Sequence, residues 1–303
     1  MRKLIIITVL IIATCLSFYG CSKKTSSRNT VLITDPMGRE VKVPKNVKRI
    51  VSMAPNVTEM LFAIGLDNEI VGVTDYCNYP ESAKNKTKIG GYYNPNVEVI
   101  LSLTPDLIIA TPDGYSKERI DKLDQTGIPI FIVNPQNIND VMVSMALLGK
   151  VTGKEEFANQ VVENMRSRIK IIKGKVSQIP EQKRPKVFYA IGEDPLVTVG
   201  PNNVVNDLLT IAGGINVALD APNSWPVYNV EAVIMKNPDV ILTAPSTMTS
   251  SDKNAQIAKW NKYRTVSAVI NGKIYAVDPD IMLRSGPRVV DGLEKLYSLF
   301  YQN

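Results

Sequence analysis

The chain of 303 residues contains no histidine at all. Histidine activates the nucleophile of Ser-His-Asp and Cys-His enzymes and supplies the imidazole ligands of metal sites, so these classes of site are excluded. An enzyme that moves protons at neutral pH would need carboxylates or lysines with shifted pKa values instead. A protein that only binds its ligand needs no histidine. The absence therefore favours a binding function, and we expect no catalytic residues and no metal held by side chains.

Cysteine is scarce as well, and the three that occur are Cys15, Cys21 and Cys77. None of them forms a CxxC pair, so a zinc or redox motif of that kind is absent. The first two lie close to the N-terminus, which leaves Cys77 alone in the part expected to fold. We expect no internal disulfide, and an inert thiol at Cys77 because no base is available to activate it.

Charge is also modest, at 21% of residues, with 35 Lys and Arg against 29 Asp and Glu and a net charge of +6. The basic residues are scattered, and the only dense run is Lys23-Lys24. We therefore expect no nucleic-acid partner. The hydrophobic fraction of 45% is typical of a folded protein. The length allows about two domains of common size.

One apolar run is present, from Leu4 to Phe18, and it follows the basic pair Arg2-Lys3. It is shorter than the ~20 residues needed to cross a bilayer, and it fits the hydrophobic region of a secretory signal. We therefore expect a signal peptide over residues 1–20. An uncleaved membrane anchor is the alternative.

The residues that follow the apolar run are Gly20, Cys21 and a short polar stretch. This order resembles a bacterial lipoprotein signal, in which the cysteine carries a lipid after cleavage. The resemblance implies lipidation of Cys21, with residues 21–30 as a flexible tether. A plain secretory signal with a chance cysteine is the alternative.

Short β-rich runs alternate with segments of helical period along the rest of the chain. Most of the runs are continuous Val, Ile and Leu, as expected for strands that are buried on both faces of a parallel sheet. The expected strands are Arg49–Met53, Ile70–Val73, Leu107–Thr111, Ile128–Val133, Lys186–Ile191, Val240–Ala244 and Lys273–Val277. The alternation predicts an α/β fold built from βαβ units.

The longest helical pattern, at residues 154–177, divides this list of strands in two. Its predicted apolar stripe consists of Phe157, Val161, Met165, Ile169, Ile172 and Val176. We therefore expect an N-terminal lobe over residues 31–153, a linking helix, and a C-terminal lobe over residues 178–303.

A second helix is predicted directly after the first strand. Asn56 is its candidate N-cap, and Glu59, three residues later, fits a capping box. Val57, Met60 and Leu61 are expected to lie on its buried face.

An internal repeat relates the two halves. The stretch NVEVILSLTPDLIIAT begins at Asn96, and NVEAVIMKNPDVILTA begins at Asn229, at an offset of 133 residues. Each stretch predicts a helix, a Pro-Asp turn and a strand. The same offset pairs Tyr92 with Trp225. One half is therefore expected to be a structural copy of the other, with a ligand cleft between them.

Four segments together resemble a known family. They are RIVSMAPNVTEMLFAIGL at Arg49–Leu66, VGVTDYCNYP at Val71–Pro80, GGYYNPNVEVILSLTPDLIIA at Gly90–Ala110 and WPVYNVEAVIMKNPDVIL at Trp225–Leu242. The chain from Val31 onward resembles the substrate-binding proteins of ABC importers for iron complexes and vitamin B12, its cobalamin-binding members most of all. The resemblance implies two Rossmann-like lobes joined by one long helix.

The resemblance also implies roles for single residues. Glu98 and Glu231 match the glutamates, one on each lobe, that pair with arginines of the permease; the alternative is that each only favours a helix N-terminus. Tyr92 and Trp225 match aromatic residues on the two sides of the cleft, where rigid rings cover a broad apolar ligand. Four weaker candidates for ligand contact are Tyr93, Tyr76, Asn56 and Arg284. Core packing of the tyrosines, capping by Asn56 and a solvated Arg284 are the alternatives.

Taken together, these features predict the extracytoplasmic, lipid-anchored binding component of an ABC importer. We expect it to be a monomer without a cofactor that captures cobalamin or a related corrinoid and delivers it to a permease with its ATPase subunits. A ferric siderophore is the alternative ligand. Haem is less favoured because only tyrosine remains to coordinate its iron. Two different functions stay open as well: a structural surface protein, and a secreted hydrolase that uses Asp106 and Asp239, although turn positions explain both aspartates.

Overall fold

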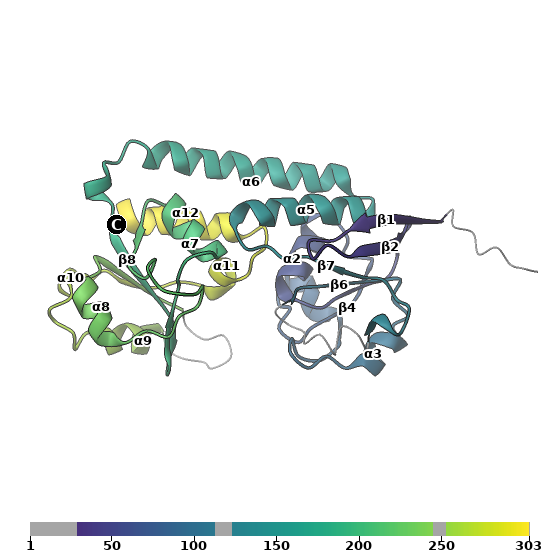
Figure 1. Ribbon diagram of the computed structural model, residues 1–303, viewed down its shortest axis with the longest axis horizontal. Coiled ribbons are helices and arrows are strands. Elements are labelled where there is room, and N and C mark those ends of the chain that lie inside the picture. The colour runs from purple at the N-terminus through teal and green to yellow at the C-terminus, as the bar shows by residue number, and fades with distance from the viewer. Residues whose placement is uncertain (1–28, 113–122, 245–252, 303) are drawn as a thin grey trace, which may run out of the picture.

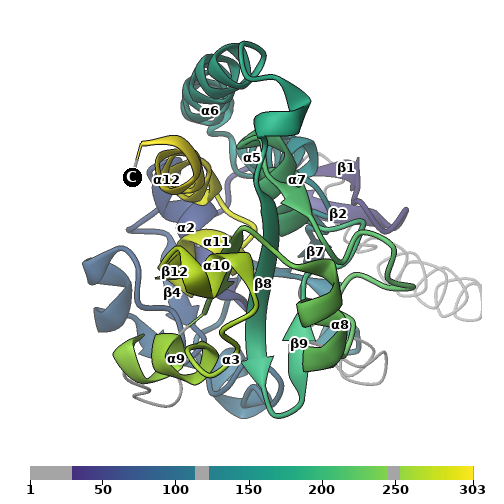
Figure 2. The ribbon, with the colours of Figure 1, turned by 90° about the vertical axis from the view of Figure 1, so that its left-hand side faces the viewer.

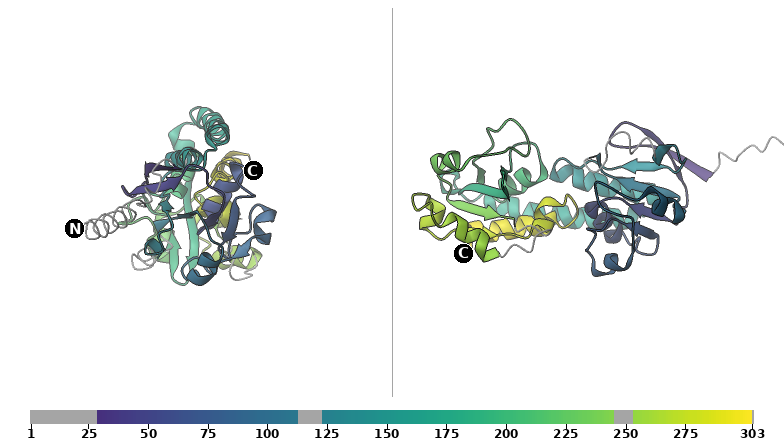
Figure 3. Two further views of the ribbon diagram at one scale, coloured as in Figure 1. Left: turned by 90° about the vertical axis from the view of Figure 1, so that its right-hand side faces the viewer. Right: turned by 90° about the horizontal axis from the view of Figure 1, so that it is seen from below.

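A computed structural model describes residues 29–112, 123–244 and 253–302. The expected signal peptide and Cys21 lie outside the described residues. The chain forms two α/β lobes that lie side by side beneath a shared layer of helices (Figure 1). A view from below shows the same two lobes end to end (Figure 3). The predicted α/β class and two-lobed arrangement are confirmed.

The N-terminal lobe contains a parallel five-stranded sheet in the order β5-β4-β3-β6-β7. Its strands are β3 (Ile50–Ser52), β4 (Ile70–Val73), β5 (Thr87–Lys88), β6 (Leu107–Ala110) and β7 (Ile130–Ile132). An antiparallel pair precedes it, formed by β1 (Thr30–Thr34) and β2 (Glu40–Pro44).

The C-terminal lobe repeats this plan with a parallel path in the order β10-β8-β11-β12. A further strand, β9, folds back antiparallel onto the end of β8, which Figure 2 shows as a hairpin. The strands are β8 (Lys186–Glu193), β9 (Leu196–Thr198), β10 (Ile215–Asn216), β11 (Val240–Thr243) and β12 (Ile274–Ala276).

The helices connect the strands along the chain and cover both sheets. In the first half they are α2 (Pro55–Ala63), α3 (Val97–Ser102), α5 (Ile138–Thr152) and α6 (Glu155–Val176), with a 3-10 helix at Glu81–Asn85. In the second half they are α7 (Val204–Ile211), α8 (Val230–Lys236), α9 (Lys253–Trp260), α10 (Ser267–Ile270), α11 (Pro279–Leu283) and α12 (Val289–Tyr301), with a 3-10 helix at Glu181–Lys183.

Helix α6 joins the two lobes. It runs along the top of both in Figure 1 and packs against α2 and α5 on one side and against α7 and α12 on the other. Its bounds differ by one residue at each end from the expected segment 154–177. In its first turns the buried stripe lies one residue further along than predicted. Ala158 and Val162 are buried there instead of Phe157 and Val161, and Phe157 is half exposed.

One hydrophobic cluster runs through the helical layer and takes residues from both sheets. It includes Ile50 and Leu107 from the N-terminal sheet and Val187 and Leu242 from the C-terminal sheet. The neighbouring residues on these strands point to the opposite sheet faces, where two smaller clusters lie, one in each lobe. Each sheet is therefore covered on both faces, which explains why its strands are continuous apolar runs.

The repeat is visible in the hydrogen bonds of its two copies. Asn96 caps α3 by accepting from the backbone N of Val99, and Asn229 caps α8 by accepting from Ala232 N. After each helix an aspartate accepts backbone N–H groups at the start of the central strand. Asp106 accepts from Lys48 and Arg49, at 2.8 and 3.1 Å. Asp239 accepts from Lys186, at 2.9 Å.

Seven predicted strands are present, whereas β1, β2, β5, β9 and β10 were not expected. The missed strands have no long apolar run; β1, for example, buries only one of its five residues. The predicted capping box is wrong. Helix α2 has Ala54 as its N-cap, and alanine has no side-chain acceptor; Asn56 and Glu59 instead contact Ser285 and Arg284 of the other lobe. The buried face with Val57, Met60 and Leu61 is confirmed.

Candidate ligand-binding cleft

A cavity of about 640 Å³ lies between the two lobes. Its N-terminal wall is built where the five parallel strands end, because Asn56, Tyr76, Tyr92, Thr111 and Asn134 follow β3, β4, β5, β6 and β7 in turn. Its other wall comes from the C-terminal lobe, through α11 and the two residues that follow it. Ligands of α/β proteins bind in this kind of crevice at the carboxyl ends of strands.

Tyrosines form the aromatic part of the wall. Tyr92 and Tyr93 meet edge to face with their ring centroids 4.9 Å apart. The Tyr92 hydroxyl is hydrogen-bonded to Thr111 Oγ1 at 2.8 Å, so this ring is held in place. Tyr93 is 64% exposed and Tyr76 is 43% exposed, so both rings present surface to a ligand.

A tight loop presents the paired tyrosines. Gly90 and Pro95 form an isolated β-bridge, and Asn96 N donates to Ile89 O at 2.7 Å, which closes the loop at its base. Gly90 has a φ of +97°, and a Cβ there would lie 3.0 Å from Asn94 O. The position therefore requires glycine.

Amides form the polar part of the cavity. Asn56, Asn94 and Asn134 all line it; Asn56 lies in the first turn of α2, and the other two come from two different loops of the N-terminal lobe. Asn56 also reaches across the cleft, because its Nδ2 lies 3.5 Å from the carbonyl oxygen of Ser285. An amide both donates and accepts hydrogen bonds, so this wall suits a neutral ligand that carries polar groups of both kinds.

Among the described lining residues, the charged side chains are Arg284 and Asp280. Their nearest atoms are 2.9 Å apart, and each side chain is about 15% exposed. Arg284 also donates to Glu59 Oε1 at 3.1 Å and to Asn78 Oδ1 at 2.7 Å. Both terminal nitrogens of its guanidinium are therefore engaged, and the alternative of a solvated arginine is wrong.

The network continues behind the cavity through Arg288. Its Nε and Nη2 donate to the two carboxylate oxygens of Glu59 at 2.9 and 2.6 Å. Its guanidinium lies 3.9 Å from the ring centroid of Tyr79, as in a cation–π contact. Burial lowers the pKa of Arg288, but its hydrogen bond and attraction to Glu59 outweigh burial, and the pKa is raised overall.

The structure brings five of the six predicted ligand contacts to one cavity: Tyr76, Tyr92, Tyr93, Asn56 and Arg284. Trp225 is the exception. It is 47% exposed and lies in the loop before α8, outside the residues that line the cavity. Its role in ligand binding stays a prediction.

The two predicted docking glutamates, Glu98 and Glu231, are both exposed in the first turns of α3 and α8. Figures 1 and 2 show these two helices in different lobes, both on the side of the molecule away from α6. A single large partner facing that side can reach both.

The structure gives no support to a hydrolase based on Asp106 and Asp239. Each aspartate accepts backbone N–H groups at the beginning of a strand in its own lobe, away from the strand ends that form the cavity. Among the described residues no group of three or more acidic or cysteine side chains is placed to hold a metal ion. No helix in the described part is both long and apolar enough to cross a membrane.

The polar residues of the site that sequence reasoning missed include Glu59, Asn94, Asn134 and Asp280. Glu59 had a signal, since a carboxylate flanked by Val57, Met60 and Leu61 lies at the border of a buried helix face. The other three lie in loops or a short helix, and no periodicity marks them.

Comparisons with known proteins show the family to which the chain belongs. A family model described as periplasmic binding protein matches residues 50–281. An uncharacterized ABC transporter substrate-binding lipoprotein of Bacillus subtilis is 34% identical over 275 residues, which are 89% of this chain and 85% of that protein. A vitamin B12-binding protein of Vibrio cholerae is 27% identical over 254 residues, which are 84% of this chain and 89% of that protein.

Solved structures show the same fold. The periplasmic vitamin B12-binding protein of Vibrio cholerae has a TM-score of 0.73 at 27% identity, covering 84% of this chain and 96% of that one. A periplasmic haem-binding protein of Roseiflexus sp. RS-1 has a TM-score of 0.76 at 27% identity, covering 85% and 99%. The chain therefore belongs to the periplasmic binding protein family, the substrate-binding proteins of ABC transporters, which bind ligands and do not catalyse reactions.

Proposed function

We propose that the chain captures cobalamin or a related corrinoid in the cleft between its lobes. The observation that carries this proposal is the chemistry of the cavity walls. Three tyrosine rings and three asparagine amides line the cavity, and Arg284, the arginine among its described lining residues, is already paired with Asp280 and Glu59. A corrin ring offers a broad apolar face edged by neutral carboxamide groups, which match the rings and the amides respectively.

The pairing of Arg284 with two carboxylates disfavours the competing anionic ligands. An anionic ferric siderophore, or the propionates of haem, would meet Arg284 already engaged by two carboxylates. Haem finds some support in the tyrosines, because Tyr93 is exposed enough for its hydroxyl to approach an iron. Haem, less favoured than a siderophore from the sequence, becomes the second candidate, since haem-binding proteins are among the solved structures with this fold.

The decisive experiment is calorimetry with residues 22–303. Cyanocobalamin, haem and several ferric siderophores are titrated in turn, and we expect tight binding of cyanocobalamin alone. A second series compares a corrinoid with all its peripheral amides and the corresponding carboxylic acid, and the amide form should bind at least 10-fold more tightly. No heat with any corrinoid, together with tight binding of a siderophore or haem, contradicts the assignment.

We further propose that the protein is a monomer which hands its ligand to an ABC permease and that a lipid on Cys21 holds it outside the cell membrane. Exposed Glu98 and Glu231 support the first part, because they place one carboxylate on each lobe. The sequence around Cys21 supports the second part. Cys21→Ala tests the anchor. The variant should leave the membrane fraction while ligand binding persists, and continued membrane attachment contradicts a lipid at this residue.

A further inference from the structure

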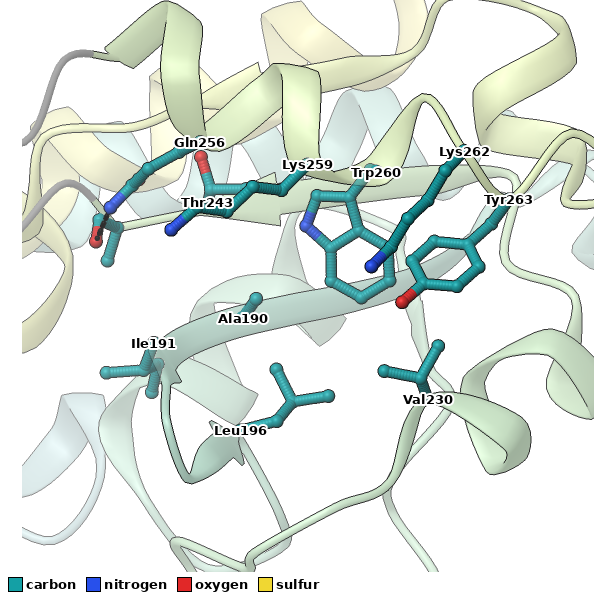
Figure 4. A pocket seen from close by; sticks show the side chains of 11 residues that line it. Ala190, Ile191, Leu196, Val230, Thr243, Gln256, Lys259, Trp260, Lys262 and Tyr263 are labelled. Atoms are coloured by element: carbon teal, nitrogen blue, oxygen red, sulfur yellow. Dashed lines mark hydrogen bonds between the residues drawn. The ribbon is translucent and has the colours of Figure 1, made fainter.

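Two other cavities differ in their relation to the cleft. One, of about 190 Å³, lies within the C-terminal lobe, where Trp260 and Leu196 line it from opposite sides (Figure 4). None of its described lining residues lines the cleft. The other, of about 350 Å³, lies behind the cleft between α2, α6 and α12. Glu59 and Arg288 line this rear cavity, and Glu59 also contacts Arg284 in the wall of the cleft. The charges at the rear cavity are therefore connected to the cleft.

The guanidinium of Arg284 has an acceptor for each of its terminal N–H groups. Nη1 donates to Glu59 Oε1 at 3.1 Å and to Asn78 Oδ1 at 2.7 Å. Nη2 donates to the carbonyl oxygen of Tyr76 at 3.3 Å and lies 2.9 Å from Asp280 Oδ1. A ligand carboxylate would have to displace one of these acceptors before it could bind Arg284. The hydrogen-bonding capacity of the two terminal nitrogens is therefore used inside the protein.

The charges of this network balance only because Glu59 belongs to it. Its carboxylate accepts from Arg288 Nε and Nη2 at 2.9 and 2.6 Å, in addition to its contact with Arg284. Asp280 supplies the second carboxylate. Two guanidinium groups therefore face two carboxylates, and removal of Glu59 would leave one positive charge in excess. The Glu59 side chain is 1% exposed and the two arginines are 14% and 15% exposed, so water screens such a charge only weakly.

We infer that Glu59 makes the cleft selective for neutral ligands over anionic ones, although it lies outside the cavity that holds them. With Glu59 in place, a ligand carboxylate would lose its hydration without meeting an unpaired cation in this network. Without Glu59, the excess positive charge would attract that carboxylate through Arg284. Glu59 is therefore a positioning residue of the cleft and not a ligand contact. The inference rests on the proposed capture of a corrinoid with neutral edge groups.

The ratio of two affinities tests this inference. The two ligands are cyanocobalamin and its monocarboxylic acid, in which one peripheral amide is hydrolysed, and calorimetry at pH 7 measures the affinity of residues 22–303 for each. Glu59→Gln should lower the preference for the amide by about 10-fold, because one added charge in a weakly screened site contributes on that order. A loss of folded protein affects both ligands equally, so a purely structural role of Glu59 would leave the ratio unchanged. Charged groups elsewhere in the chain are common to all variants and cancel in the comparison.

Two further variants make the test specific. Glu59→Gln/Arg288→Gln removes one charge of each sign, so the ratio should return toward that of the unmodified protein. Glu163→Gln removes a carboxylate from an exposed pair on α6 and should leave the ratio unchanged, because solvent screens that charge. An unchanged ratio in Glu59→Gln, or the same change in the single and the double variant, overturns the inference.

The opposite change covers the case in which Glu59→Gln does not fold. Arg288→Gln leaves the network with an excess negative charge, and the preference for the amide should then rise. Its thermal unfolding midpoint shows whether the variant is folded, and calorimetry at pH 8 keeps the carboxylates ionised. An unchanged or lowered preference in Arg288→Gln overturns the inference.

Failure of the proposed function is a separate outcome. If neither corrinoid binds the unmodified protein, the corrinoid assignment fails, and haem with its neutral dimethyl ester replaces the two ligands. The same variants then decide on Glu59, because a propionate differs from its methyl ester in charge as an acid differs from its amide. Ratios that do not follow the charge of the network overturn the role of Glu59 with either pair of ligands.

Discussion

Glu59 on α2 and Arg288, the residue before α12, join the two lobes through hydrogen bonds of 2.9 and 2.6 Å. They are 229 positions apart in the chain. The Glu59 side chain is only 1% exposed, so its charge depends on Arg288 and Arg284 for compensation. Together with α6, this contact ties the lobes at the back of the cleft.

The first prediction concerns this buried charge. Glu59→Gln leaves two arginines without their carboxylate, and breaking a buried ion pair on one side costs about 3–5 kcal/mol. We expect a loss of that size in the free energy of unfolding, measured by urea denaturation. Glu163→Gln is the matched control, because its pair with Arg166 is exposed and should contribute less than about 1 kcal/mol. Equal losses for the two variants contradict a clamp between the lobes.

The second prediction separates the Tyr92 ring from its hydroxyl. Tyr92→Phe removes the hydrogen bond to Thr111, which we expect to cost about 1 kcal/mol of stability and little cobalamin affinity. Tyr92→Ala removes the ring and should weaken cobalamin binding at least 10-fold in calorimetry. If Tyr92→Phe alone loses that affinity, the hydroxyl and not the ring face recognises the ligand.

The third prediction concerns docking. Reversal of both Glu98 and Glu231 to Arg should leave the affinity for cobalamin intact, because neither residue lines the cleft. Uptake by cells that carry the permease should be abolished. Each introduced arginine would then face an arginine of the permease, and the two like charges would repel. Each single reversal should reduce uptake less than the pair. Normal uptake by the double variant contradicts the docking role.

The fourth prediction tests the helix caps of the repeat. Asn96→Ala and Asn229→Ala each remove a side-chain acceptor from an N-terminal turn, at a cost of about 1 kcal/mol. Asn56→Ala is the control, because Asn56 lies inside α2 and caps nothing. Denaturant titration of the three variants should therefore rank Asn56→Ala as the least destabilised. A loss at Asn56 as large as at the two caps would show that its contact with Ser285 is as important.

The fifth prediction is a pH dependence at α6. Hydrogen bonds from Arg168 hold the pKa of Glu294 below its ordinary value of 4.5. A depressed carboxyl pKa adds stability above the ordinary value, and this stability is lost as pH falls through the folded value. Glu294→Gln should therefore lower the melting temperature at pH 7, and the difference from the unmodified protein should shrink progressively as the pH falls below 4.5. A constant difference between pH 7 and pH 3 contradicts this linkage.

Much of the fold was predictable from local patterns. Continuous Val, Ile and Leu runs indicate strands buried on both faces, and the seven strands predicted from them are present. The repeat around Asn96 and Asn229 indicated two related halves, and its asparagines and aspartates make equivalent backbone contacts. Edge strands such as β5 and β10 were not predicted, because a strand of two residues is too short to show a periodic pattern.

The candidate site was predictable only in part. The family motifs identified Tyr76, Tyr92 and Tyr93, which the structure brings to one cavity. Trp225 was expected on the opposite side of the cleft; it lies outside the residues that line this cavity, and its role stays a prediction. The position of a loop depends on the residues it packs against, and the sequence near Trp225 does not indicate which residues these are.

The sequence by itself determined the class of fold, the twofold plan and the absence of imidazole chemistry, because periodicity, repeats and composition are properties of the chain alone. Only the tertiary structure decided what Glu59 does. Its position three residues after Asn56 predicts the second member of a capping box, yet it is the buried partner of two arginines more than 220 positions away. A local pattern cannot encode that choice, since a buried carboxylate is stable only where folding brings its counter-charges.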